Sequence, residues 1–491
     1  MAKILYHAVP GDWRKEQKYQ FLEKAASIAG VKWKKLKPDK KQNWLDYGLR
    51  PEFDSFLPIA NHAAQPGDAI QPIFKEHSNG VKTHRDAFAI NFNRERVRKN
   101  MEAMIDAYNG QVDSYHRLKK KPAKTEDFID YESGKIGWSE LLKKSLERGI
   151  RVEFDEKSIR PSNYRPYTAT WLYFDSVMNE RRYGFPDIFP KSDSKNSVIW
   201  LKVGGDWPMF ALMSDRICDL MPQGGSQCFP LYRYVENKNK KKLECRDNLT
   251  PKALMLFQIF YDDDGITRAD IFHYVYALLH HPAYRTRYAE NLKRELPRIP
   301  FVGVGRVSPL RTASSKSPAG AHGVTHPTFF PLSAVEKMQG DAKPGHDPKA
   351  SAKLFHAFAA AGKKLADLHV NYESAKEFPL QRQENKDVKL DWRVEAMKLS
   401  KDKASLFYND FLTLSGIPAE VYDYRLGNRS ALEWVIDQYR VAKDDQGNLT
   451  SDPNRLDNEE YIVRLIGQVI TVSLETQKVV NHLPKITPTE E

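Results

Sequence analysis

Cysteine is scarce in this sequence. Only three of the 491 residues are cysteines, Cys218, Cys228 and Cys245. Their spacing fits no zinc pattern, and their odd number excludes a complete disulfide framework. We therefore expect reduced thiols in a cytoplasmic protein.

Long apolar runs are also missing. No run approaches the roughly 20 residues that a membrane helix needs. The start of the chain, Met1-Ala2-Lys3 followed by Ile4-Leu5-Tyr6, has no secretory leader pattern. The sequence predicts a protein with no membrane partner.

The motifs of nucleotide and cofactor chemistry are absent as well. The sequence has no G-x-x-x-x-G-K-S/T loop, and Gly303-Val304-Gly305 lacks the third glycine of a dinucleotide-binding turn. It also lacks the Asn/Asp-Pro-Pro-Tyr/Phe turn with which amino-methylating enzymes hold an extruded base. We predict no catalytic residues and no cofactor in this chain.

Three remaining groups of residues could carry chemistry only in principle. Asp262-Asp263-Asp264 could bind Mg²⁺, but adjacent acids at a helix end usually stay in water. His280-His281 has no partner pair at zinc-ligand spacing. The segment 153–157 (EFDEK) resembles a nuclease E-x-K pattern without the upstream Pro-Asp. We interpret all three as structural and predict no metal site.

The composition indicates a folded, basic protein. Hydrophobic residues make up 41% of the chain and aromatic residues 11%, which is enough for sizeable packed cores. A chain of this length has room for two to four domains. The net charge of +12 favours a polyanionic partner without requiring one.

Periodicity predicts a mixed helix and strand content. Apolar residues at helical spacing predict a buried helix from Arg268 that ends at His281-Pro282, because proline disfavours helical geometry in the residue before it. Residues 302–350 are rich in Gly, Ser, Pro and Ala and predict a loose insertion. Further helices are expected at 94–118, 138–148, 250–261, 351–369 and 457–482, and strands at 172–174, 198–201 and 228–234.

Basic and aromatic residues gather in four loop segments. Arginine can make bidentate contacts to guanine, whereas lysine more often contacts phosphate. The structural alternative for each segment is a salt bridge or turn closure, and the same alternative applies to the arginines that follow the helix at 268–281. Our candidate DNA-contacting residues are Lys82 and Arg85 (78–86), Arg160, Tyr164 and Arg165 (160–167), Arg181, Arg182 and Tyr183 (179–183), and Arg425, Asn428 and Arg429 (424–430).

At these segments the sequence resembles the C-terminal target-recognition (specificity) region of type ISP restriction-modification enzymes and related large adenine-specific DNA methyltransferases. The similar segments keep the family's order from about residue 70 onward. They are IFKEHSNGVKTHRDAF (73–88), IRPSNYRPYTATWLYFD (159–175), NERRYGFPDIFP (179–190), QCFPLYRY (227–234), DIFHYVYALLHHPAYRTRYAENLKRELPRIPF (270–301), GKKLADLHVNYE (362–373) and DYRLGNRSALEWVIDQY (423–439).

The resemblance implies a domain that reads a short site in double-stranded DNA and presents its adenine for N6 methylation. Residues 1–65 resemble the last strands of the family's methyltransferase domain, and 66–491 the specificity domain. The catalytic turn, the S-adenosylmethionine site, the motor and the nuclease of the family would lie upstream of Met1. We expect a methyltransferase/helicase-nuclease polypeptide encoded upstream to supply them, unless the chain is a truncated piece.

The sequence therefore predicts an α+β protein, with a short α/β methyltransferase remnant followed by a large mixed DNA-recognition domain that has helical-bundle parts. An alternative function is a scaffold that docks a methyltransferase or helicase partner and reads DNA little. An independent hydrolase would need an active-site cluster, which the sequence does not show.

Overall fold

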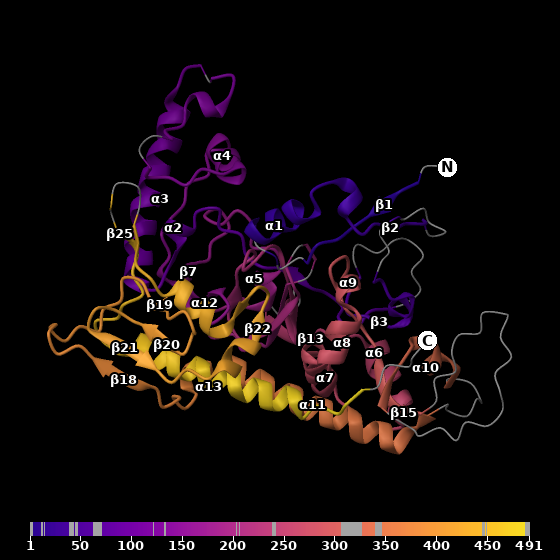
Figure 1. Cartoon of the computed structure of the whole chain (residues 1–491). Coiled ribbons are helices and arrows are strands. Elements are labelled where there is room, and N and C mark those ends of the chain that lie inside the picture. Colours follow the sequence, from indigo (N-terminus) through magenta and orange to yellow (C-terminus); the bar gives the residue numbers. More distant parts are fainter. Residues whose placement is uncertain are drawn as a thin grey trace, which may run out of the picture.

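A computed structural model shows a mixed α/β chain with several small sheets (Figure 1). The expected division at residue 65/66 falls within 62–70, outside the described residues, and stays a prediction. The structure describes residues 3–10, 13, 15–38, 44, 48–61, 71–120, 122–131, 134–202, 204–205, 207–237, 242–305, 327–338, 346–443, 447 and 449–486.

A four-stranded sheet separates two hydrophobic cores. Its strands β8 and β9 are buried at every residue, and their side chains alternate between the cores. Trp200 and Leu212 face the first core, whereas Ile199 and Met213 face the second. Burial on both faces explains why these strands read as continuous apolar runs. The strand order is β4 (Ser78–Asn79), β11 (Ser226–Pro230), β8 (Val198–Lys202) and β9 (Phe210–Ser214).

The first core lies between a second four-stranded sheet and a helical arm, which projects at the top of Figure 1. Asn93 caps the arm's long helix by accepting a bond from the Arg96 backbone N–H. The helix expected at 94–118 is confirmed. The arm consists of α3 (Arg94–Arg117) and α4 (Glu140–Glu147), preceded by α2 (Asp86–Ala89); the sheet order is β10 (Ile217–Cys218), β6 (Ile159–Arg165), β7 (Thr168–Tyr173) and β5 (Ile90–Asn91).

The second core surrounds the helix α7 (Arg268–His280). A capping box of Thr267 and Asp270 begins this helix, and it ends before Pro282, as the sequence predicts. The neighbouring helix α11 approaches α7 closely at Gly362, where an added Cβ would lie 1.8 Å from the His273 carbonyl oxygen. The other helices of this region are α6 (Pro251–Tyr261), α8 (Pro282–Arg287), α9 (Ala289–Leu292) and α11 (Pro348–Val370).

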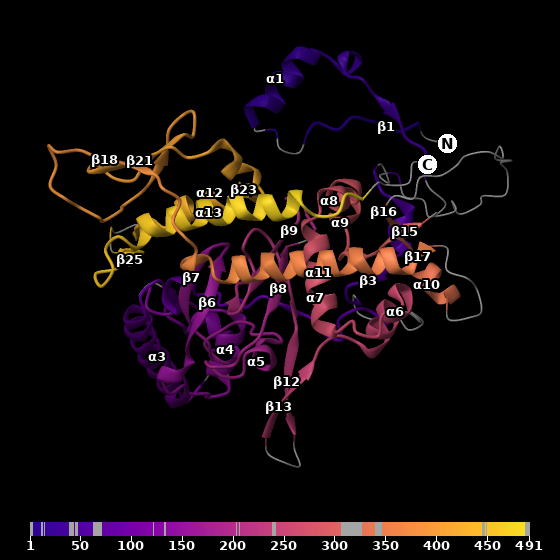
Figure 2. The ribbon, with the colours of Figure 1, turned by 90° about the horizontal axis from the view of Figure 1, so that it is seen from below.

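The C-terminal helix α13 (Tyr461–Asn481) packs against α11, and the two lie side by side in Figure 2. A β12–β13 ribbon projects from the other side of the molecule in the same view. The remaining elements are α5 (Phe185–Ile188), α12 (Ala431–Gln438), β3 (Leu57–Pro58), β12 (Tyr232–Asn237), β13 (Lys242–Asp247), β14 (Arg298–Ile299), β18 (Gln381–Glu384), β19 (Lys398–Leu399), β20 (Ser405–Phe407), β21 (Leu412–Ser415), β22 (Arg425–Leu426), β23 (Arg429–Ser430), β24 (Ala442–Lys443) and β25 (Leu449–Ser451).

The loose insertion expected at 302–350 stays a prediction, because more than half of it lies outside the described residues. The described residues in and next to it form a three-stranded sheet and a helix, and Phe301, Phe330 and Val335 are buried in the second core. Gly303 permits close packing, because an added Cβ would lie about 3 Å from Phe260 and Phe330. The rest, 306–326 and 339–345, lies outside the described residues. The elements are β15 (Phe301–Gly305), β16 (Pro327–Phe330), α10 (Leu332–Met338) and β17 (His346–Asp347).

The first described residues form a small unit of their own, which we call the N-terminal unit (residues 3–38 as far as described). Its strands β1 (Leu5–Tyr6) and β2 (Lys34–Lys35) pair with each other, and α1 (Lys15–Ala25) has no buried residue. Leu36 is the sole buried residue among those described in the unit. The unit stands apart from the cores in Figure 2.

Candidate nucleic-acid interface

A loop at residues 217–225 contacts two of the four predicted segments, and a third segment pairs with one of these two. The Val81 N–H donates to the Cys218 carbonyl at 2.8 Å, and the Leu220 N–H donates to the Val81 carbonyl at 2.9 Å. β10 runs parallel to β6, with Ile217 opposite Ser162. Lys82 and Arg181 exchange two backbone bonds of 2.9 Å. Segments 78–86, 160–167 and 179–183 are therefore neighbours.

The same loop holds the fourth segment through a pair of amide side chains. Gln223 donates from Nε2 to the Asn428 side chain and accepts from the Asn428 backbone N–H at 3.1 Å. Gly427 makes this approach possible, because its φ is +71° and an added Cβ would lie 1.8 Å from Gln223 Oε1. Three of the segments thus contact the 217–225 loop, and the fourth, 179–183, pairs with segment 78–86. We call the common surface of the four segments the four-segment surface.

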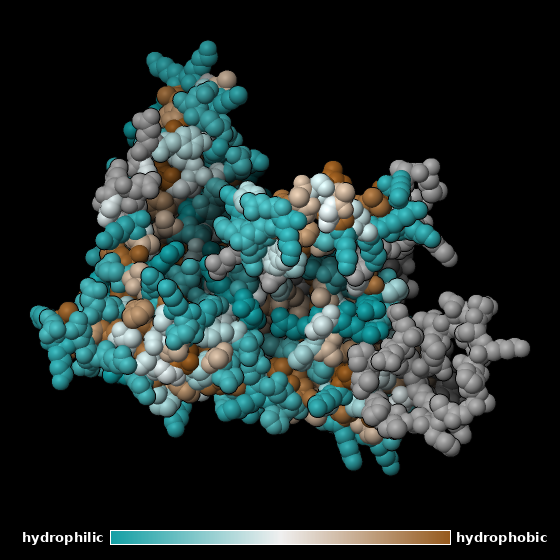
Figure 3. Space-filling model, in the orientation of Figure 1, coloured by the Kyte–Doolittle hydropathy of each residue, from teal (hydrophilic) through white to brown (hydrophobic). Residues whose placement is uncertain are grey.

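The molecular surface is hollowed near these segments. Figure 3 shows a hydrophilic hollow between the α3–α4 arm and the N-terminal unit, over the area where α2, α5 and β22 lie in Figure 1. These elements directly follow or contain predicted residues: α2 follows Arg85, α5 follows Tyr183, and β22 begins at Arg425.

The cations of the four-segment surface that face solvent are Lys82, Arg181 and Arg425. Arg181 donates to the carbonyl of Glu180 at 3.2 Å, and Arg425 donates to the Asn428 carbonyl. Within the described part of the chain none of the three forms an ion pair. Their charges are therefore available to an anionic partner.

Tyr183 is a strained and exposed aromatic residue beside these cations. Its side chain is 43% exposed and its φ is +47°, a left-handed backbone conformation that is rare for a bulky residue. His84 in the neighbouring segment also has a positive φ, of 63°. Such strain gathers at functional sites when the surrounding structure maintains it.

Arg182 and Arg429 are only partly available. The Arg182 guanidinium lies 5.2 Å from the centre of the Phe174 ring, and burial lowers its pKa while Asp175 opposes the shift. Arg429 pairs with Asp437 at 2.9 Å and lies over Trp434. Both arginines retain charge near the surface, but part of it is used by internal contacts.

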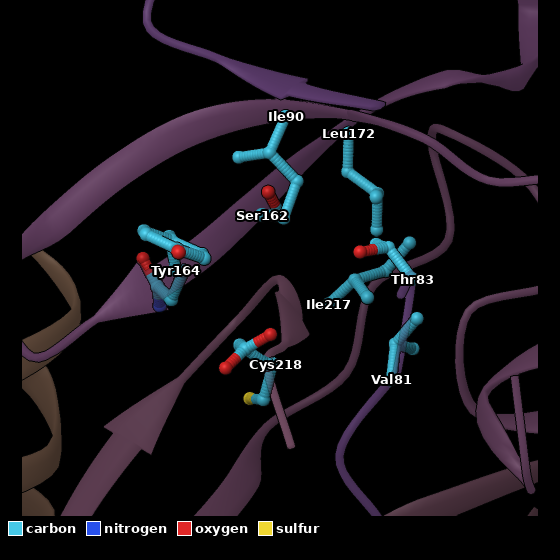
Figure 4. A pocket seen from close by; sticks show the side chains of 10 residues that line it. Val81, Thr83, Ile90, Ser162, Tyr164, Leu172, Ile217 and Cys218 are labelled. Carbon is cyan, nitrogen blue, oxygen red and sulfur yellow. The ribbon is translucent and has the colours of Figure 1, made fainter. Parts of the chain in front are cut away.

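Tyr164 and Arg165 form a fixed pair next to the loop. The Arg165 guanidinium lies 3.7 Å from the centre of the Tyr164 ring, and its Nη1 donates to Asp219 Oδ1 at 2.7 Å. The Tyr164 hydroxyl donates to Asp86 at 2.9 Å. Burial raises the pKa of Asp219 to about 7, although the Arg165 charge pulls in the other direction. Figure 4 shows the small pocket where these segments meet, with Tyr164 and Cys218 on its wall.

Arg85 and Arg160 are buried, so the expectation that they contact DNA is not supported by their positions. The Arg85 guanidinium donates to the carbonyls of Gly137 and Met178 and to the Ser139 hydroxyl. Arg160 donates to two backbone carbonyls, at Phe189 and Lys191. A guanidinium whose donors are used by internal carbonyls stabilises the fold and is shielded from a partner.

The arginines after α7 also make internal contacts, as the structural interpretation of that stretch expects. Arg285 donates to the Met209 carbonyl at 2.6 Å. Arg287 pairs with Glu52 at 2.8 Å. Arg298 is 3.4 Å from Glu295. These arginines stabilise the region of the second core and are not part of the four-segment surface.

The weaker chemical candidates take structural positions. Asp263 pairs with His356 at 2.7 Å and accepts from the Gly265 N–H. His280 bonds to the Tyr276 carbonyl, and His281 to the Pro484 carbonyl. Among the described residues no group of three metal-ligating side chains occurs. In the same part of the chain no helix is both long and apolar enough to cross a membrane.

Sequence reasoning missed the 217–225 loop as the centre of the surface. Its glycines, Gly224 and Gly225, indicate no more than a turn, and its contacts come from positions far away in the sequence. The available signal was Met221-Pro222-Gln223-Gly224-Gly225, a polar turn with an amide side chain between two apolar strands. Asp219 and Gln223 are the residues it adds to the candidate site.

Comparison with known proteins agrees with this architecture. A family model described as the Type ISP C-terminal specificity domain matches residues 72–306 and 349–466. The matched ranges cover well over half of the chain. The chain is thus a specificity domain. It belongs to the Type ISP C-terminal specificity domain family. None of the curated proteins matches the sequence.

Several solved structures resemble nearly the whole chain. Three of them are a nuclease-deletion mutant of the Type ISP restriction-modification enzyme LlaGI with a DNA substrate mimic (27% identity, TM-score 0.75), the ATP-dependent Type ISP enzyme LlaBIII bound to DNA (26%, 0.74) and a DrdV–DNA complex (29%, 0.73). The matches cover 99%, 97% and 99% of this chain. The chain spans 40%, 28% and 43% of the length of those proteins.

Proposed function

We propose that this chain is the DNA target-recognition module of a Type ISP-like restriction-modification system and that DNA binds at the four-segment surface. The observation that carries the proposal is that three separate basic segments contact one loop and a fourth pairs with one of them, in a specificity-domain fold whose solved relatives are bound to DNA. Base recognition needs side chains held in fixed places, and strands and loop contacts hold them here.

The proposed contacts divide by chemistry. Lys82 and Arg181 are exposed and unpaired by carboxylates, so we assign them to phosphates, which give salt-dependent affinity without sequence information. Arg165, Arg425 and Asn428 are held by neighbouring groups and suit base edges. Tyr164, Arg182, Tyr183 and Arg429 complete the proposed surface.

A binding experiment with the full chain tests this proposal. The chain is titrated with a pool of random-site duplexes at several salt concentrations, and the retained sequences are read. We expect enrichment of one asymmetric motif. Lys82→Ala and Arg181→Ala should weaken binding to every duplex alike, and each should lower the salt slope by about 1.

Lys353→Ala on α11 is the matched control, because it removes one exposed charge at the base of the molecule in Figure 1, away from the hollow. Its affinity should equal that of the wild type. Equal retention of all sequences at every salt concentration contradicts the proposed specificity.

We further propose that the N-terminal unit docks the methyltransferase-bearing part of such a system, which would hold S-adenosylmethionine. Large apolar side chains in this unit lie in water. More than half of the length of each solved relative lies outside the match, so there is a counterpart to cover them. The side chains are Ile4 (36% exposed), Leu5 (44%), Tyr19 (54%), Leu22 (60%), Ile28 (80%) and Trp33 (41%).

Co-elution with the polypeptide that carries the methyltransferase motifs tests the docking proposal. Leu22→Ser should weaken the complex. Leu456→Ser is its control, because Leu456 is 96% exposed but lies outside the unit. If a complex forms and DNA is not retained by the chain, the scaffold function is favoured instead. A cytoplasmic location also stays a prediction.

A further inference from the structure

A bulge in strand β6 sets the direction of the Arg165 side chain. The pairing of β6 with β7 shifts between Asn163 and Arg165, so Tyr164 is an extra residue in the ladder. In a regular strand, neighbouring side chains point to opposite faces, and a bulge interrupts this alternation. The bulge lets Tyr164 and Arg165 stack on each other at 3.7 Å.

Asp219 fixes the other side of the Arg165 guanidinium. It is 9% exposed, and its Oδ1 accepts both from Arg165 Nη1 at 2.7 Å and from the Met221 backbone N–H at 2.8 Å. Gly80 permits the aspartate's position, because a Cβ at residue 80 would lie 2.2 Å from the Asp219 carbonyl oxygen. The carboxylate is therefore held by the loop and not by solvent.

One edge of the Arg165 guanidinium makes no hydrogen bond to the described residues. Both hydrogen bonds of the Arg165 side chain, to Asp219 and to the Tyr164 carbonyl, use Nη1. Within the described part of the chain Nε and Nη2 have no hydrogen-bond partner, and neither is among the buried unpaired atoms. The arrangement thus leaves two adjacent donors open, which is the donor pattern that arginine offers to the O6 and N7 of guanine.

We infer that Asp219 is a positioning residue for sequence discrimination: with the Tyr164 ring, it holds the Arg165 guanidinium so that Nε and Nη2 face a base. The inference rests on the proposed function and extends it to a residue that does not contact DNA. A free arginine would lose its side-chain entropy on binding, whereas this one is already ordered.

A double-mutant cycle tests the inference with the full chain. The quantity measured is the ratio of affinities for the preferred duplex and for a duplex changed at one base pair, determined for each pair of the site. Arg165→Ala should reduce this ratio about tenfold at one base pair, which corresponds to about 1.4 kcal/mol. Asp219→Ala should reduce the ratio at the same base pair.

The double variant distinguishes positioning from general damage. If Asp219 acts through Arg165, the two changes together should reduce the ratio no further than Arg165→Ala alone. Losses that multiply to about a hundredfold, or an unchanged ratio in Asp219→Ala, overturn the inference. If the wild type itself prefers no sequence, the proposed function fails instead, so the two failures are distinguishable.

Two further variants keep the test interpretable. Asp219→Asn preserves an oxygen acceptor for the Met221 N–H, so it replaces Asp219→Ala if the alanine variant does not fold. It should still reduce the affinity ratio severalfold. Its affinity for the duplex changed at one base pair should be at least as strong as that of the wild type. Asp452→Ala removes an aspartate that pairs with Arg393 at 2.7 Å, outside the four-segment surface, and should leave the ratio unchanged.

Discussion

Replacing Arg85 by alanine should damage the fold and spare DNA binding. The Arg85 side chain is bonded to two separate segments of the chain, at Gly137 and Ser139 in one and at Met178 in the other, and Ser139 is also the N-cap of α4. Burial lowers the pKa of Arg85 to about 10, with Glu180 opposing the shift, so the group stays charged at neutral pH.

The expected loss of stability follows from the acceptors that lose their hydrogen bond to Arg85. Two buried acceptors and one partly buried acceptor lose their donor, and leaving a buried acceptor unpaired costs about 1–3 kcal/mol. Removing the guanidinium also removes its own desolvation cost, which offsets part of the loss. We expect a net destabilisation of about 3 kcal/mol, together with faster amide exchange in α4, whose N-cap would lose its ordering contact.

Thermal melting, hydrogen exchange and DNA titration of Arg85→Ala check this expectation. The midpoint should fall, and exchange should rise most between residues 125 and 147. At a temperature where the variant is folded, affinity and salt slope should match the wild type. A variant with wild-type stability and a reduced salt slope would refute the reasoning and return Arg85 to the DNA surface.

Two further predictions concern the second core. Burial lowers the pKa of His280 to about 4 and that of His369 well below its usual value. The unfolded chain therefore binds more protons below pH 6.5, so the melting temperature should fall as the pH decreases from 6.5 towards 4, and His369→Gln should show a shallower fall. Gly362→Ala places a Cβ 1.8 Å from the His273 carbonyl and should destabilise by at least about 1–3 kcal/mol in melting experiments. Its control is Gly110→Ala in α3, where an added Cβ would meet no atom within 4 Å and stability should rise by about 0.5–1 kcal/mol. An unchanged melting temperature in Gly362→Ala would contradict the close packing of α7 and α11.

Local sequence patterns are sufficient to predict the long helices. Apolar spacing and the Asn93 cap define α3, and Pro282 defines the end of α7, because these signals lie within the elements themselves. The two-faced burial of β8 and β9 is also visible as unbroken apolar runs.

The division of the arginines into buried and exposed ones could not be predicted from local sequence. Arg85 and Arg181 stand in similar polar, turn-rich surroundings. The hydrogen-bond partners of Arg85 lie 52 to 93 positions away in the sequence. Two of them are the backbone carbonyls of Gly137 and Met178, and a backbone carbonyl has no sequence signature. Convergence of the four segments has the same origin, since Gln223 and Asn428 are 205 positions apart.

The sheet that carries the 217–225 loop, between its strands β9 and β11, has a consequence for how specificity can change. A slip of β8 or β9 by one residue would exchange the side chains of two cores, so the alignment of this sheet is strongly fixed. The loop is thus mounted on a rigid frame, and its tip belongs to neither core. In the proposed function, a change in this loop would alter specificity through the residues that it positions, Arg165 and Asn428, without rebuilding the interior of the protein.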